Sequence, residues 1–217
     1  MPILTEAGET GGNASGHYFH QDLLVARRIH EANPRRHVDV GSRVDGFVAH
    51  VAAFREIEVL DIRSNPEVPH PILFHRLDLM APLPESWKSS CDSLSCLHAL
   101  EHFGLGRYGD PIDPIGHEKA FANLTDMLEP GGILYLSVPI GPQRVEFNAH
   151  RVFASSTILR LLEEKFSIEG FHYVDDHGNL HPDADWRSPE AETSFGCQWG
   201  CGIFLARKTK ASAGGAL

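Results

Sequence analysis

The sequence predicts an α/β fold in which the strands of an open sheet alternate with helices. Three observations lead to this prediction. A β-branched strand at 38–40 ends in a Gly-Ser turn, and a helical segment at 47–54 follows it. A second apolar strand at 57–60 comes next. Later, an amphipathic helix at 118–128 is followed by a Pro-Gly-Gly turn and an apolar strand at 133–138.

The other elements continue this alternation. A helix with apolar residues at 23–29 ends before Asn33-Pro34, because proline disfavours the helical conformation of the residue before it. The polar residues Tyr18 to Asp22 before this helix have two interpretations: they line the mouth of a cofactor site, or Asp22 simply caps the helix. Further strands are predicted at 72–77, 93–97, 171–174 and 201–206, and a further helix at 155–166.

The composition is that of one soluble globular domain. Of the 217 residues, 42% are hydrophobic and 22% are charged, and the formal net charge is −10. This negative charge makes a nucleic-acid partner unlikely. No apolar run reaches the roughly 18 residues of a membrane span, so we expect a cytoplasmic protein without a signal peptide. We expect flexible segments at 1–15 and 208–217 on either side of a domain at 16–207.

The four cysteines do not form a disulfide pattern. Cys91 and Cys96 fall in a predicted buried strand, where cysteine behaves as a small hydrophobic residue. Cys197 and Cys201 have the spacing of half a metal site, but no matching pair is found elsewhere in the sequence.

Polar residues at the ends of the first three strands predict a site for a ribose-bearing cofactor. Gly41 lets the backbone approach a ligand closely, and the helix that follows offers unpaired N–H groups. Asp61 lies about 20 residues later, where a carboxylate can accept both ribose hydroxyls. Asp78 follows the third strand, where it can either accept a hydrogen bond from an amine such as that of adenine or cap its own loop.

The end of the fourth strand carries three titratable groups, His98, Glu101 and His102. In an open α/β sheet, ligands bind at the carboxyl ends of the strands, so these groups are candidates for chemistry. The long segment 103–117 that follows is rich in glycine and proline. We predict that it is a lid or a substrate loop.

These pieces together resemble the class I S-adenosylmethionine-dependent methyltransferases. The matching segments are Val38-Asp39-Val40-Gly41-Ser42, Asp61, Leu77-Asp78, Leu100-Glu101-His102, and the run from Leu128 through Pro130-Gly131-Gly132 to Pro139. The resemblance covers roughly residues 17–207. It implies a Rossmann-like three-layer sandwich, with a seven-stranded, mostly parallel sheet whose last strand is antiparallel.

The resemblance also assigns cofactor contacts. It implies that Gly41 and Ser42 approach the methionine part of S-adenosylmethionine, that Asp61 holds the ribose and that Asp78 faces the adenine amine. The complete implied set of cofactor-binding residues is Asp39, Gly41, Ser42, Asp45, Asp61, Asp78, Leu79 and His98. The turn departs from the family, which usually carries Gly-x-Gly-x-Gly where this chain has Ser42-Arg43-Val44.

Within this class, the chain resembles a subgroup associated with polysaccharide biosynthesis. The segments Gly104–Pro111 and Asn148–Phe153 carry this resemblance. It implies O-methylation of a sugar or another hydroxyl-bearing small molecule or glycan. Such a reaction needs a general base, and histidine is suitable because its pKa lies near neutrality. The candidates are His98, His102 and His150.

The segment His98-x-x-Glu101-His102 also resembles the Glu-x-x-Glu-His ligand set of some metal-dependent O-methyltransferases. Histidine in place of the first glutamate favours Zn²⁺, Fe²⁺ or Mn²⁺ over Mg²⁺. A divalent ion at His98, Glu101 and His102 would lower the pKa of a bound hydroxyl. The alternative is that Glu101 and His102 only cap the following turn and line the pocket.

Two other functions remain open at this point. One is a cofactor-binding protein without catalysis, and the other is an NAD-dependent oxidoreductase, although the sequence has no Tyr-x-x-x-Lys motif and no second domain to support the latter. The sequence does not define the acceptor or the oligomeric state.

Overall fold

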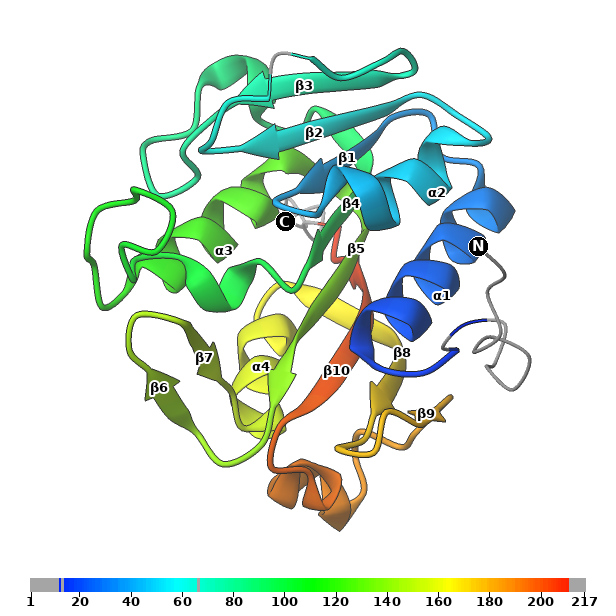
Figure 1. The fold of residues 1–217 in the computed structure, drawn as a ribbon, viewed down its shortest axis with the longest axis vertical. Coiled ribbons are helices and arrows are strands. Elements are labelled where there is room, and N and C mark those ends of the chain that lie inside the picture. Colours follow the sequence, from blue (N-terminus) through cyan, green and yellow to red (C-terminus); the bar gives the residue numbers. More distant parts are fainter. Residues whose placement is uncertain (1–11, 13, 66, 211–217) are drawn as a thin grey trace, which may run out of the picture.

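A computed structural model describes residues 12, 14–65 and 67–210 of the chain. Its centre is an eight-stranded sheet with the order β3-β2-β1-β4-β5-β10-β8-β9 (Figure 1). The strands β1 (His37–Val40), β2 (Ile57–Asp61), β3 (Ile72–Arg76), β4 (Cys91–Leu97) and β5 (Leu128–Ile140) pair in parallel. The last strand, β10 (Gly200–Lys208), lies antiparallel between β5 and β8 (Phe166–Val174).

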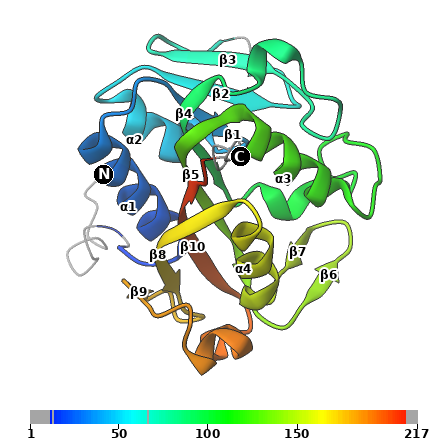
Figure 2. The same cartoon turned by 180° about the vertical axis from the view of Figure 1, so that it is seen from behind.

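Helices cover both faces of the sheet, so the predicted three-layer architecture is confirmed. Figures 1 and 2 show α1 (His17–Ala32) and α2 (Ala49–Ala52) on one side, and α3 (Gly116–Met127) and α4 (Ser155–Glu163) on the other. Each pair of helices buries its apolar side chains in a separate core cluster. The predicted seven strands are present, and the two-residue β9 (Leu180–His181) extends the sheet by one more. The hairpin β6 (Arg144–Glu146) and β7 (His150–Val152) lies outside the sheet.

Several element boundaries differ from the predicted ones. The first helix begins at His17 instead of Leu23, so the polar entry forms its first turns. Asp22 is therefore a buried residue inside the helix, and the prediction that it caps the helix is wrong. The predicted helix at 47–54 is a π-helical turn at Val44–Val48 followed by one short α-helical turn, α2.

The Pro-Gly-Gly segment at 130–132 does not separate helix from strand as predicted. The strand β5 starts directly after α3 at Leu128, and the extra residues are absorbed by an irregularity in its pairing with β4 between Cys91 and Ser93. A local irregularity of this kind bends the strand while keeping its apolar side chains in register with the core.

The ends of the chain are only partly described. Most of the segment 1–15, and residues 211–217 of the predicted tail, lie outside the described residues. The predicted tail begins too early, because Lys208 belongs to β10 and the Thr209 amide donates to the Lys165 carbonyl oxygen. All four cysteines are free and buried, as expected for Cys91 and Cys96. In the described part of the chain, no helix has the length and apolar character needed to cross a membrane.

A buried hydrogen-bond network holds the turn after β1. Asp39 is fully buried, and its carboxylate accepts the Ser42 amide at 3.1 Å and the Ser42 hydroxyl at 2.8 Å. The Ser95 hydroxyl from β4 donates to the same carboxylate at 2.5 Å. Ser95 also contacts the buried ring of His37 at 3.2 Å. The turn is therefore fixed from below by side chains of β1 and β4.

This network predicts a specific pH dependence. Burial raises the pKa of Asp39 to about 6, against the opposing effect of its hydrogen bonds to Ser95 and Ser42. A carboxyl whose pKa is higher in the folded than in the unfolded chain binds more protons when folded, so its contribution to stability grows as the pH falls below about 6 and levels off near 4. Relative to Asp39→Asn, which does not titrate, the wild type should gain about 2 kcal/mol of unfolding free energy between pH 7.5 and pH 4.5. Urea unfolding of both proteins at the two pH values measures this change. If the difference in unfolding free energy between the wild type and Asp39→Asn is the same at both pH values, the predicted role of Asp39 is wrong.

Candidate functional site

The main cavity of the structure lies at the carboxyl ends of β1, β2 and β4. It has a volume of about 550 Å³, within the range of roughly 300–1,000 Å³ that is usual for small-molecule sites. The strand order reverses here, because β1 is followed by β2 on one side and has β4 on the other. In open α/β sheets this is where ligands bind.

Most of the residues predicted to bind the cofactor line this cavity. They are Gly41, Ser42, Asp45, Asp61, Asp78, Leu79 and His98. Asp39 does not line the cavity, because its buried carboxylate accepts hydrogen bonds from the amide and the hydroxyl of Ser42. Asp78 accepts the Met80 amide at 2.8 Å, so this residue caps its own loop and also faces the cavity. Asp78 therefore caps its loop as one interpretation expected, and its contact with an adenine amine stays a prediction.

Gly41 is required by the shape of the turn in two ways. Its φ of +75° lies in the left-handed region, which favours glycine. A Cβ atom at this position would also stand 2.8 Å from the Cβ of Ala99, in the segment after β4. The turn therefore brings the backbone close to the neighbouring strand end and leaves the cavity open above it.

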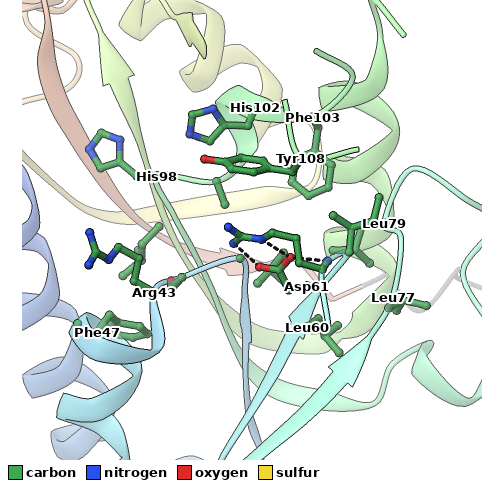
Figure 3. A pocket seen from close by; sticks show the side chains of 18 of the residues that line it. Arg43, Phe47, Leu60, Asp61, Leu77, Leu79, His98, His102, Phe103 and Tyr108 are labelled. Carbon is green, nitrogen blue, oxygen red and sulfur yellow. Dashed lines mark hydrogen bonds and ion pairs between the residues drawn. The ribbon is translucent and has the colours of Figure 1, made fainter. Parts of the chain in front are cut away.

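Asp61 stands at the end of β2 and is held by Arg63. The Arg63 guanidinium donates to both carboxylate oxygens, at 2.9 Å and 2.6 Å (Figure 3). The Tyr108 ring covers this pair, with the guanidinium carbon 4.5 Å from the ring centre. Tyr108 belongs to the predicted lid segment, which also contributes Asp110 to the cavity wall. This loop is held in shape by Asp110, whose carboxylate accepts the backbone amides of Gly104, Gly106 and Tyr108.

Two of the three predicted general bases, His98 and His102, line the cavity, whereas His150 does not. His102 Nδ1 lies 2.7 Å from the carbonyl oxygen of Ala149. Because a carbonyl oxygen only accepts, Nδ1 carries the proton, and Nε2 of the neutral ring is free to accept one. The centre of the His150 ring lies 6.4 Å from the centre of the His102 ring.

Glu101 is buried between the two cavity histidines. Its Oε1 atom accepts from His98 Nδ1 at 2.9 Å and lies 3.6 Å from His102 Nε2. Burial lowers the pKa of His102, although the Glu101 carboxylate opposes this shift. Burial has the same effect on His98, but the Cys201 sulfur and Glu101 outweigh it and raise the pKa of that ring. His102 is therefore the stronger candidate for a base that is neutral before it accepts a proton.

The predicted metal ligands His98, Glu101 and His102 are close together, but another set is gathered more tightly. Among the described residues, His17, His98 and Cys201 place one ligand atom each within 4.8 Å of the others. His98 is common to both sets. Cys201 joins the group without Cys197, so the predicted pair of cysteines is not brought together as a ligand pair.

A continuous series of ring contacts links the two histidines that flank Glu101. Ring centres of successive members lie 4.9–6.4 Å apart. In order, the members are Tyr18, His98, His17, Trp199, His150, His102 and Tyr108. His98, His102 and His150, the segment from Tyr18 to Asp22 and the loop that contains Tyr108 were predicted from the sequence. Cys201 was considered only as a partner of Cys197. His17 and Trp199 were not predicted, and only their contacts in the folded chain identify them.

Comparison with solved structures places this fold among methyltransferase-like proteins. The 4+2 cyclase SpnF matches with a TM-score of 0.61 and 17% identity, over 88% of this chain and 82% of that one. A second match is the 1,6-didemethyltoxoflavin-N1-methyltransferase of Burkholderia thailandensis, solved with 1,6-didemethyltoxoflavin and S-adenosylhomocysteine. Its TM-score is 0.59 and its sequence identity is 18%, over 88% of this chain and 79% of that one. A third match is the N-methyltransferase NodS of Bradyrhizobium japonicum WM9 in complex with S-adenosylhomocysteine. Its TM-score is 0.58 and its sequence identity is 14%, over 90% of this chain and 89% of that one.

At these identities the likeness establishes the fold. No curated protein matches the sequence. A family model does match it, over residues 75–185, which is more than half of the chain. The matched region runs from the end of β3 through the histidines after β4 to the loop beyond β8. On this evidence the chain belongs to the family described as Caenorhabditis protein of unknown function, DUF268.

Proposed function

We propose that this protein is an S-adenosylmethionine-dependent methyltransferase. The observation that carries the proposal is the cavity at the switch point of the sheet, which is bordered by the Gly41-Ser42 turn, Asp61 and Asp78. These are the positions at which the family resemblance places the methionine, ribose and adenine parts of the cofactor. Neighbours of the same fold that are solved with S-adenosylhomocysteine support this assignment.

We further propose that the acceptor is a hydroxyl-bearing small molecule or glycan. The end of the cavity at His98 and His102 has polar groups for orienting hydroxyls, and the surrounding rings offer apolar faces. Tyr18 and Trp199 remain largely exposed, at 57% and 49%, and are free to contact a ligand larger than the cavity. A sugar, which has both hydroxyls and apolar faces, suits these surroundings.

His102 is the proposed general base. When bound, S-adenosylmethionine supplies an electrophilic methyl group, which moves to the acceptor oxygen as the bond to sulfur breaks. The acceptor hydroxyl gives its proton to Nε2 of His102, whose Nδ1–H stays bonded to the Ala149 carbonyl. The buried Glu101 carboxylate, 3.6 Å from Nε2, stabilises the charged ring that results.

Two alternatives predict different ligands or outcomes. A cofactor-binding protein without catalysis would bind S-adenosylmethionine but transfer no methyl group. An oxidoreductase would bind NAD instead.

Cofactor binding can be measured without knowing the acceptor. Isothermal titration should show that S-adenosylhomocysteine binds and that NAD does not. Asp61→Asn should weaken this binding by about 10- to 100-fold, because a hydrogen bond to a charged group contributes about 1.5–3 kcal/mol. The matched control is Asp185→Asn, which changes an exposed aspartate outside the cavity and should leave affinity unchanged. Equal affinities for the wild type and both variants would remove Asp61 from the site.

The role of His102 as general base can be tested once an acceptor is known. Methyl transfer from radiolabelled S-adenosylmethionine to a panel of free sugars, nucleotide sugars and glycans identifies an acceptor. With that acceptor, His102→Gln should lower kcat by about 10²–10⁴-fold, while S-adenosylhomocysteine affinity stays within a few fold. His177→Gln changes an exposed histidine outside the cavity and should keep full activity. Full activity of His102→Gln would show that another group takes the proton.

A further inference from the structure

We propose that His17, His98 and Cys201 form a binding site for a thiophilic divalent metal ion, with Zn²⁺ as the preferred ion. The three residues come from the first turn of α1, the segment after β4 and the start of β10. Their ligand atoms lie within 4.8 Å of one another. Two imidazoles and one thiolate are a ligand set typical of zinc, and three protein ligands leave one position open.

The orientation of the His98 ring supports this site independently of the spacing. Its side chain is only 4% exposed, and Nδ1 donates to the Glu101 carboxylate. The other ring nitrogen, Nε2, is buried and has no hydrogen-bond partner in the described structure. A buried nitrogen without a partner costs free energy, so it needs an explanation. A metal ion bound at Nε2 provides one.

Glu101 has the position of an outer-shell partner in this site. Metal-binding histidines usually donate their second N–H to a carboxylate, which fixes the ring and raises its basicity. The bond from His98 Nδ1 to Glu101 Oε1 at 2.9 Å is of this kind. Glu101 was predicted as a metal ligand, whereas its bond to Nδ1 of His98 supports a role as a positioning residue for that ring.

The backbone around His98 also holds the ring in place. His98 has a φ of +49°, a left-handed conformation that is uncommon outside glycine. Its amide donates to both the carbonyl and the hydroxyl oxygen of Ser137, at 3.0 Å and 3.1 Å. The His17 ring stacks on the His98 ring at 5.3 Å with an interplanar angle of 6°, which brings the second imidazole to the same place.

The site borders the cavity through His98, so a bound ion would fix this ring at the edge of the acceptor site. That role depends on the proposed function. The binding of the metal does not, and it can be tested without any methyl donor or acceptor.

The test is a titration of the metal-free full-length protein with Co²⁺, followed by displacement with Zn²⁺. We expect one Co²⁺ per chain, a sulfur-to-cobalt charge-transfer band in the near ultraviolet and tetrahedral bands in the visible. Zn²⁺ should remove these bands and raise the melting temperature of the wild type. Absence of the sulfur-to-cobalt band in the folded wild type would overturn the proposal, whatever the result for S-adenosylhomocysteine.

Variants identify the ligands. Cys201→Ser should abolish the charge-transfer band. His17→Gln should weaken Zn²⁺ binding by at least about 10-fold. Glu101→Gln should weaken Zn²⁺ binding by about 10- to 100-fold, because His98 is then no longer held in position. Cys197→Ser is the matched control, because it removes a buried cysteine that is not part of the cluster, and it should bind metal normally. Circular dichroism confirms that each variant is folded. Metal binding that survives Cys201→Ser and is lost in His102→Gln would instead support the ligand set His98, Glu101 and His102.

Discussion

The hydrogen bonds of the buried Asp39 carboxylate are the interaction on which the Gly41 end of the cavity depends. The carboxylate accepts hydrogen bonds from the backbone and the hydroxyl of Ser42, and from Ser95 on the neighbouring strand. These bonds replace the water that a fully buried carboxylate loses, and they hold the turn that contains Gly41 close to β4. Asp39 thus prepares the surface for a ligand that it does not itself touch.

The sequence was sufficient to predict which residues line the Gly41 end of the cavity, because the signals there are local. An alternating apolar strand, a glycine turn and a carboxylate at the end of the next strand lie close together in the chain, and parallel strands bring their carboxyl ends to one edge. Asp61 and Asp78 therefore line the cavity as expected. The role of Asp39 was not predictable in the same way, because it depends on which side chain of β4 lies opposite, and that register is set by tertiary packing.

The histidine-rich end is different because distant segments build it. Cys201 lies near the start of β10, opposite Pro139 at the end of β5. Since β10 runs antiparallel to its neighbours, the start of this strand lies at the edge where the parallel strands end. Cys201 at the beginning of the last strand therefore lies close to His98. No local pattern in the sequence indicates that these two residues meet. The first turn of α1 brings His17 to the same edge.

A chain of buried polar contacts joins the two ends of the site. Gln21 of α1 donates to Asp22, which lines the cavity, and accepts from the Ser137 hydroxyl at 2.6 Å. Ser137 in turn accepts the amide of His98. Because each member has a partner, movement of His98 would leave a buried polar group without one, at a cost of about 1–3 kcal/mol. The first turns of α1 thus position His98 as well as lining the cavity, which explains why this helix begins at His17 and continues past the polar residues that looked like its entry.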